Sequence, residues 1–294
     1  MKDICCIGHV TLDKIITPDH TFYQNGGTAY YFAYGINHLP HDVSFQMVTS
    51  IASKDREAIS KMEAEGIDVV AFDSKETVFF ENKYGNNRNA RSQRVLAKSD
   101  PFTVEQMQKL EARVFHLGSL LSDDFSPEVV ECLSRKGKVS IDVQGYLREV
   151  RDEKVYACDW KDKMEVLAMT DILKLNEYEM EVITGEKDPR RVAKIIASWG
   201  VKEVVLTFGS YGSQIYYGGK YYDIPAYEPQ YCIDVTGCGD TFSTGYLYCR
   251  AKGLDCEEAG KFAAAMCTLK IEKPGPFSED ISRIERIIRL GANI

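Results

Sequence analysis

Features that mark several protein classes are missing from this sequence. It has no apolar run near the ~20 residues that a membrane span requires, so we expect no membrane helix. Its 36 Lys and Arg are outnumbered by 44 Asp and Glu, for a net charge of -8. A chain of this charge repels polyphosphate backbones, which argues against a nucleic-acid partner. The apolar stretch at the N-terminus is too short for a signal-peptide core and reads as a first strand.

Disulfide and zinc frameworks are also absent from the pattern. The nine cysteines are odd in number and scattered, and no two form a Cys-x-x-Cys pair. We therefore expect free thiols in a reducing cytoplasm. The chain also lacks low-complexity tracts and internal repeats, so a repeat architecture is not expected.

What is present has the composition of an ordinary globular protein, with 44% apolar and 27% charged residues. Short apolar runs alternate with helical patterns, which predicts a doubly wound, mainly parallel α/β sheet with ligands at the carboxyl ends of its strands. We expect a single domain over residues 1–294. Predicted strands are 4–8, 43–49, 114–117, 139–143, 172–175 and 204–208, and predicted helices are 54–65, 127–135, 176–184, 190–199, 240–252, 257–271 and 279–290.

Two polar segments, about 10–23 and 77–98, interrupt the alternation. The second is typical of a hairpin that turns at residues 84–87. Because both flank the first βα units, we predict a small projecting β-sheet that acts as a lid. Its basic side chains are expected to face solvent, with the alternative that one or two reach the phosphoryl group when the lid closes; they are Lys83, Arg88, Arg91, Arg94 and Lys98.

The most informative stretch is 234–242, Asp-Val-Thr-Gly-Cys-Gly-Asp-Thr-Phe, which lies between a strand-like run at 231–233 and a long helix. Its glycines let the backbone approach a ligand, and the amides of a first helical turn form an anion site. Asp240 adds a carboxylate at the same point. Amides that hold a phosphoryl group beside a base are what phosphoryl transfer to an alcohol requires. The alternative interpretation is structural: a glycine-rich segment that leads into a helix with a capping Asp is common and by itself indicates no function.

This stretch resembles the second signature of the ribokinase-like (PfkB) carbohydrate kinases, Asp-Thr-x-Gly-Ala-Gly-Asp, with changes at Val235 and Cys238. The resemblance implies Asp240 as the catalytic base and an anion hole at Gly237, Cys238 and Gly239. It implies ATP as the phosphoryl donor. It also implies a potassium ion held by backbone oxygens near Asp234 and residues 273–275, and therefore stimulation by potassium.

Two further motifs match the family on the donor side. Asn176 and Glu179 form an Asn-x-x-Glu motif after a strand, which in the family orients Mg²⁺ and its waters around the phosphates. The same two residues also fit a helix N-cap with a capping box. Thr207, Gly209 and Gly212 match a Thr-x-Gly-x-x-Gly loop that packs on ATP in the family.

A third match lies on the substrate side. Gly26 and Gly27 resemble the glycine pair of the first signature, and Asp13 corresponds to an aspartate that holds substrate hydroxyls, a strong handle for a polyol. Tyr31 stands where relatives that use ribose carry Asn, which changes the hydrogen-bonding map of the pocket. Ribose is therefore not the expected substrate. Residues 140–148 faintly resemble a subgroup that includes plant inositol kinases.

The expected function is ATP-dependent phosphorylation of a small sugar or polyol by a monomer or a homodimer formed through the lid. A nucleoside kinase of the same family remains an alternative, because Phe22, Tyr30 and Tyr31 could stack a base. A catalytically inactive sugar-binding regulator is the alternative of a different class, although Asp240 is present. A nicotinamide-binding Rossmann enzyme fails, because Gly8 is followed by His9-Val10-Thr11-Leu12 and not by the required glycines.

Overall fold

The structure, a computed structural model, describes residues 1–84 and 91–291. Nine strands form one sheet in the order β15-β14-β13-β12-β9-β8-β1-β4-β5. Pairing is parallel from β13 to β5 and antiparallel in the hairpin of β14 and β15. The strands are β1 Lys2–Ile7, β4 Phe45–Ala52, β5 Val69–Ser74, β8 Ala112–Gly118, β9 Lys138–Asp142, β12 Ile172–Asn176, β13 Glu203–Thr207, β14 Ser213–Tyr217 and β15 Lys220–Ile224. The predicted doubly wound α/β fold is confirmed.

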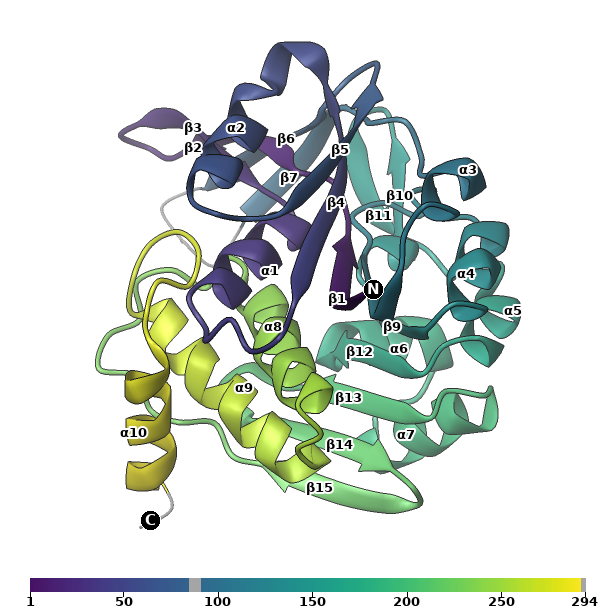
Figure 1. Cartoon of the computed structure of the whole chain (residues 1–294), viewed down its shortest axis with the longest axis vertical. Coiled ribbons are helices and arrows are strands. Elements are labelled where there is room, and N and C mark those ends of the chain that lie inside the picture. Colours follow the sequence, from purple (N-terminus) through teal and green to yellow (C-terminus); the bar gives the residue numbers. More distant parts are fainter. Residues whose placement is uncertain (85–90, 292–294) are drawn as a thin grey trace.

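Helices cover both faces of this sheet (Figure 1). Alternate residues of β1 enter two different cores, Ile4 and Cys6 on one side and Cys5 and Ile7 on the other, because successive side chains of a strand point to opposite faces. One face packs against α1 Thr28–Asn37, α2 Glu57–Ala64, α8 Cys238–Ala251, α9 Cys256–Ile271 and α10 Ile281–Gly291, and the other against α3 Val104–Met107, α4 Pro127–Ser134, α5 Lys163–Ala168, α6 Glu177–Thr184 and α7 Pro189–Ser198.

A second sheet of six strands has the order β10-β11-β7-β6-β2-β3 and is antiparallel except between β2 and β6. Four of its strands come from the two polar segments: β2 Thr11–Ile16, β3 Thr21–Gly26, β6 Val78–Tyr84 and β7 Arg91–Ala97. The other two, β10 Arg148–Arg151 and β11 Lys154–Ala157, were not expected, because runs this short and charged carry no strand pattern. The turn expected at 84–87 lies largely outside the described residues.

One predicted strand is wrong. Residues 231–233, before α8, form no strand. The amides of Ile233 and Asp234 donate to the carbonyl of Ile271 at the end of α9, at 2.8 and 3.2 Å, and so are not available to a sheet. The segment therefore ties the start of α8 to the end of α9.

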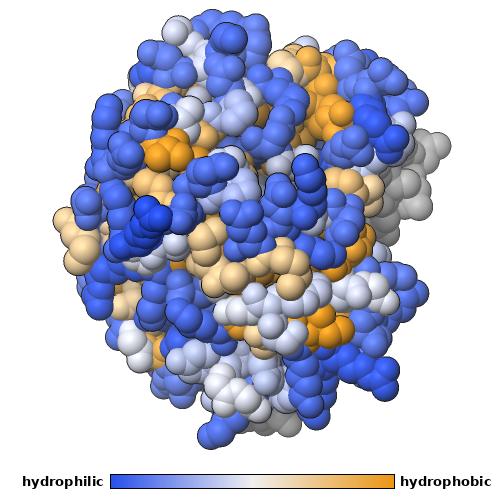
Figure 2. All heavy atoms as spheres, turned by 90° about the vertical axis from the view of Figure 1, so that its right-hand side faces the viewer, coloured by the Kyte–Doolittle hydropathy of each residue, from blue (hydrophilic) through white to orange (hydrophobic). Residues whose placement is uncertain are grey.

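The surface and the helices agree with a globular protein. On the face that Figure 2 shows, apolar side chains form small groups surrounded by hydrophilic residues. None of the helices within residues 1–84 and 91–291 has the length and apolar character of a membrane span. All nine cysteines are free thiols.

Candidate active site

The N-terminus of α8 is built as an anion-binding turn. Gly237 caps the helix with a left-handed backbone, at φ 76°. The first intrahelical hydrogen bond runs from the Thr241 amide to the Gly237 carbonyl, at 2.8 Å, and the Cys238 amide donates to Val235 at 3.2 Å. The amides of Gly239 and Asp240 therefore precede the helical ladder, at the positive end of the helix dipole, where they can donate to a phosphoryl oxygen.

Asp240 stands in the first turn of that helix and is half-buried. Burial and the like charge of Asp142 raise the pKa of Asp240 to about 6, while the charge of Lys174 and then a hydrogen bond from the Thr28 hydroxyl oppose the rise. Its carboxylate is therefore ionised at neutral pH and yet basic enough to accept a proton from a hydroxyl group. Thr28 begins α1, so the starts of α1 and α8 meet at the candidate base.

A buried ion pair lies beside this turn. Lys174 Nζ is 2.6 Å from Asp142 Oδ2, and a methyl group added at Gly239 would lie 3.2 Å from the same nitrogen. The ammonium group is thus next to the backbone that would hold the phosphoryl group. Burial lowers the pKa of Lys174, but the charges of Asp142 and Glu179 outweigh it, so the pKa is raised and the cation persists.

The capping-box geometry at α6 is present. The Asn176 side chain accepts from the amides of Tyr178 and Glu179, at 2.9 and 3.0 Å, and Glu179 Oε2 accepts from the Asn176 amide at 2.9 Å. Burial, followed by the charge of Asp142, raises the pKa of Glu179. Glu179 is therefore both a cap of α6 and one of three carboxylates that crowd the site.

The carboxylates outnumber the cation among them. Asp142, Glu179 and Asp240 surround Lys174, and the charge of Asp142 raises the pKa of each of the other two carboxylates. Oxygen donors with an excess of negative charge suit a hydrated divalent cation such as Mg²⁺. No ready-made group of three or more metal ligands occurs in the described part of the chain.

The predicted substrate residues lie at the junction of the two sheets. Asp13 is buried, and its Oδ1 accepts from the Thr11 hydroxyl at 2.8 Å. A methyl group at Gly26 would lie 2.9 Å from Asp13 Oδ2, and one at Gly27 would lie 2.2 Å from the His9 carbonyl oxygen. Gly27 is therefore required by close approach to the His9 backbone and by its φ of 99°, and a side chain at Gly26 would displace the Asp13 carboxylate.

Tyr31 connects the substrate side with the phosphate side. A methyl group added at Gly237 would lie 2.4 Å from its ring, so this buried tyrosine packs against the cap of α8. Burial and the charges of Asp234, Asp13 and Asp240 raise the pKa of Tyr31, so the phenol stays protonated. The structure thus brings together Tyr31, Asp13 and Asp240.

The predicted nucleotide loop follows β13. Thr207 ends that strand and pairs in register with Asn176 at the end of β12, so the donor-side motifs lie on adjacent strands. Gly209 and Gly212 both have positive φ, and a methyl group at Gly212 would lie 2.2 Å from the Ile224 carbonyl. The side chain of Tyr211, between them, is 91% exposed.

Asp234 lies below the anion-binding turn. Its Oδ1 accepts from the Thr236 amide at 2.9 Å, and its Oδ2 accepts from the Gly275 amide at 3.1 Å. The same carboxylate is 3.1 Å from Lys270 Nζ. The sequence predicts a monovalent-cation site here, where the structure places a lysine.

The basic residues of the second sheet are partly paired. Arg94 forms ion pairs with Glu81, at 3.1 Å, and with Glu153, and Lys98 pairs with Asp123. Lys83 is exposed. Arg88 lies outside the described residues, and the side chain of Arg91 is not described. The partners in these pairs, Glu81, Glu153 and Asp123, do not belong to the candidate site.

Three contributors were not assigned a role from the sequence: Asp142, Lys174 and Thr28. The sequence does contain a signal for Lys174 and Asp142, because each is a charged residue in or at the end of a largely buried strand. A charged residue in such a place nearly always has a partner of opposite charge. Thr28 had none beyond its position after the glycine pair. Their proximity to Asp240 comes from the order β13-β12-β9-β8-β1, which the sequence does not reveal.

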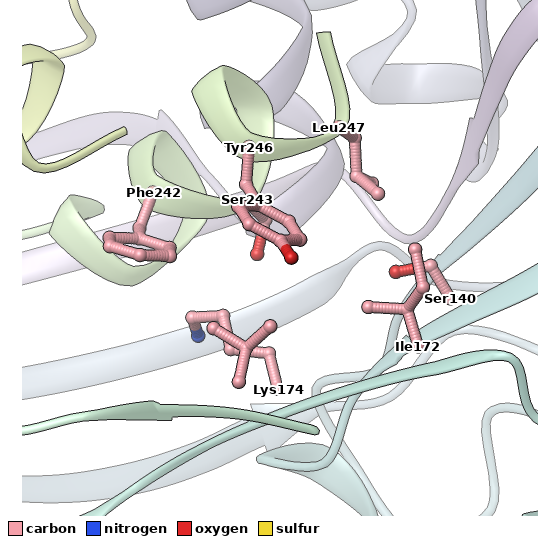
Figure 3. Close-up of a pocket in the computed structure, with 8 residues that line it drawn as sticks. Ser140, Ile172, Lys174, Phe242, Ser243, Tyr246 and Leu247 are labelled. Carbon is pink, nitrogen blue, oxygen red and sulfur yellow. The ribbon is translucent and has the colours of Figure 1, made fainter. Parts of the chain in front are cut away.

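Two hollows of the molecule are lined by residues other than the glycines of this turn. Figure 3 shows a cavity of about 10 Å³ under α8, where Phe242, Ser243 and Tyr246 project toward Lys174 and Ile172; it has room for at most one water molecule. A pocket of about 230 Å³ lies at the amino ends of β1 and β4 and is lined by Lys2, Ile36, Asn37, His41, Val43, Ser44, Phe45, Gly66, Ile67 and Asp68.

Comparison with known proteins agrees with the geometry. The family described as "pfkB family carbohydrate kinase" matches residues 1–281. A cytidine kinase from Thermococcus kodakarensis is 26% identical over 287 residues, which are 95% of this chain and 99% of the relative. A solved pyrophosphate-dependent kinase of the ribokinase family, complexed with a pyrophosphate analogue and myo-inositol, has TM-score 0.86 and 29% identity, with 97% of this chain and 100% of that chain covered. Arabidopsis thaliana ribokinase, complexed with ribose and ATP, has TM-score 0.78 and 19% identity, covering 98% and 99%.

Proposed function

The chain belongs to the pfkB family of carbohydrate kinases, and from that premise we propose that it transfers the terminal phosphoryl group of ATP to a hydroxyl group of a small polyol, with Asp240 as general base. As a member it is a kinase that acts on an alcohol acceptor. The observation that carries the proposal is the meeting of a basic carboxylate, the first-turn amides of α8 and the Lys174 ammonium group at one point. These are the groups that remove a hydroxyl proton and stabilise the transferring phosphoryl group.

Each step has an assigned group. The Asp240 carboxylate accepts the proton as the hydroxyl oxygen attacks the terminal phosphorus of ATP, the bond from that phosphorus to the bridging oxygen breaks, and ADP leaves. The amides of Gly239 and Asp240 with the Lys174 ammonium group hold the charge on the phosphoryl oxygens. Asp142, at 2.6 Å, keeps that ammonium group in place. Asn176 and Glu179 would hold Mg²⁺ through its water shell, and the bound ion would neutralise charge on the donor phosphates.

The donor has two candidates, and each has support. The loop from Thr207 to Gly212 favours ATP. No other atom lies within 4 Å of a methyl group added at Gly209, so a ligand has room to approach the backbone there. Tyr211 in the same loop has an exposed ring on which a base could stack. Pyrophosphate is favoured by the solved relative at TM-score 0.86, whose donor it is. The anion-binding turn and Lys174 serve either donor, because both transfer a terminal phosphoryl group.

Polar groups on the inner face of the second sheet favour a polyhydroxylated acceptor. Asp13 on β2 pairs with Phe80 on β6, and Asn82 lies two residues beyond Phe80, so Asp13 and Asn82 point to the same face of the sheet. Both residues are buried. Gln93 faces Asn82 across β6 and β7, and its Nε2 donates to Asn82 Oδ1 at 2.9 Å. A carboxylate and two amides match several adjacent hydroxyls, and we propose a cyclitol or sugar. The nucleoside alternative draws support from the cytidine kinase relative.

We also propose that the second sheet acts as a lid over this site within a single domain. Its β2 follows β1 directly through residues 8–10, and Asp13 on β2 would contact the acceptor. Acceptor binding would then draw the sheet toward α8 and exclude water from the phosphoryl group.

The test is a matrix of acceptors and donors. Purified protein with Mg²⁺ is incubated with myo-inositol, fructose, ribose, 2-keto-3-deoxygluconate, cytidine or adenosine, and with ATP or pyrophosphate. Phosphorylated product is measured directly. A cyclitol or sugar phosphate formed from ATP supports the proposal; product only from pyrophosphate replaces the donor, and product only from nucleosides replaces the acceptor. Saturable acceptor binding without turnover from either donor would indicate the inactive regulator.

A further inference from the structure

A fully buried lysine lies under the anion-binding turn. Lys270 is in the last turn of α9, and its side chain has 0% exposure. Its Nζ donates to the Asp234 carbonyl oxygen at 2.8 Å and lies 3.1 Å from Asp234 Oδ2. Burying an ammonium group is costly unless it is paired and hydrogen-bonded, so these two oxygens account for its place.

The lysine and Asp234 connect two loops. Asp234 begins the segment that leads to Gly237, and its carboxylate also accepts from the amides of Thr236 and Gly275. Gly275 follows α9, so one carboxylate joins the approach to α8 with the exit from α9. The ammonium group neutralises that carboxylate and binds the adjoining carbonyl. Fixing this segment fixes the cap on which the Gly239 and Asp240 amides depend.

A monovalent metal ion at Asp234 would require the carbonyl and carboxylate oxygens that Lys270 already contacts. The sequence led us to expect potassium held by backbone oxygens around Asp234 and residues 273–275. A second cation on those oxygens would lie within a few ångström of the Lys270 ammonium group and would meet strong repulsion there. The residues present therefore do not fit a dissociable ion at Asp234.

We propose that the Lys270 ammonium group is a built-in replacement for a monovalent cation, so that this kinase requires no potassium. The inference rests on the proposed function only in taking the turn at 237–240 as the phosphoryl site. Lys270 is a positioning residue, because it acts through Asp234 and the loop and contacts neither substrate.

The first experiment uses the unmodified protein in chlorides of potassium, sodium and tetramethylammonium at equal ionic strength. We expect kcat within about twofold across the three salts and one melting temperature without substrates, since the internal cation is always present. Stimulation by potassium of more than about fivefold, or a melting temperature raised by potassium alone, would overturn the proposal. The melting comparison needs no turnover, so it remains decisive if no acceptor is found.

The second experiment is Lys270→Met, which removes the charge and keeps the bulk. We expect kcat to fall at least about 10²-fold, and potassium or ammonium ions to restore part of it and to raise the melting temperature. Full activity, or a loss that neither ion relieves, would contradict the cation role. If this variant does not fold, the salt series on the unmodified protein decides. Lys261→Met is the matched control: it lies on the same helix in an exposed pair with Glu257, and it should acquire no cation dependence.

Discussion

At the scale of single residues, Asp240 combines a proposed function with a cost in stability. Its pKa is raised because burial and Asp142 disfavour its charge in the folded protein. A carboxyl group whose folded pKa is raised weakens folding as pH rises from its unfolded value of about 4 toward about 6, and the penalty is constant at higher pH. The candidate base is therefore a carboxylate whose charge lowers the stability of the folded protein.

Asp240→Asn should abolish turnover and stabilise the protein. The amide cannot accept the hydroxyl proton, so kcat should fall by about 10²–10⁴-fold or more. The free energy of unfolding at pH 8 should rise by about 1–2 kcal/mol, since an unfavourable charge is removed. Steady-state kinetics and denaturant unfolding test both. More than a tenth of the original kcat would refute the assignment as base.

The pH dependence of kcat/KM should show the same group. Below about pH 6 the Asp240 carboxylate becomes protonated, so kcat/KM should fall about tenfold per pH unit, with a plateau above about pH 7. Asp142→Asn removes the neighbouring negative charge and should move the acidic limb to lower pH. A profile whose midpoint is the same in Asp142→Asn would assign the limb to another group.

At the scale of elements, the start of α6 serves as a cap and as a candidate metal site. Glu179→Gln separates the two, because Gln also completes a capping box while losing the charge. We expect equal or higher thermal stability, because the raised pKa of Glu179 indicates an unfavourable charge in the folded protein. We also expect a higher Mg²⁺ concentration for half-maximal rate. Glu258→Gln is the control, because Glu258 completes a similar box with Asp255 at the start of α9, far from any assigned chemistry. An unchanged Mg²⁺ requirement in Glu179→Gln would leave Glu179 as a cap only.

The cap of α8 gives a second test at this scale. Gly237→Ala should lose most of its kcat and about 1–3 kcal/mol of stability, because the added methyl group meets the Tyr31 ring at 2.4 Å and φ is 76°. Gly253→Ala is the control: it follows the other end of α8, also at positive φ (85°), with nothing within 4 Å. It should share the backbone strain and keep its kcat. Equal kcat in the two variants would show that the cap does not position the site.

At the scale of the whole molecule, the proposed lid couples acceptor binding to donor chemistry. Asp13→Ala should raise KM for the true acceptor at least about tenfold, because hydrogen bonds to a charged group contribute roughly 1.5–3 kcal/mol each. It should also raise hydrolysis of the donor relative to transfer, since the lid closes less completely. Product and free phosphate are measured together. An unaltered KM and ratio would exclude Asp13 as the acceptor handle.

The fold class and the main candidate motif could be predicted from the sequence. The apolar strand runs determine the α/β class, because strands such as β1 must bury both faces. The stretch from Asp234 to Asp240 predicts an anion-binding turn with a carboxylate. Such a turn needs glycines, free amides at a helix start and an acidic residue, and all three come from neighbouring positions in the sequence. Strand edges shifted by one to three residues, and the expected strand at 231–233 failed, because the Ile271 carbonyl at the end of α9 takes its amides.

The tertiary structure decided which distant charges act together. The order of β9 and β12 sets Lys174 against Asp142 and beside Gly239. Burial and the charge of Asp142 raise the pKa of Asp240, and the charge of Lys174 limits that rise. The packing of α9 against the approach to α8 buries Lys270 on Asp234. A sequence shows that a charged residue sits in an apolar pattern, but its partner lies tens of residues away, and only the strand order and helix packing bring the two within hydrogen-bonding distance.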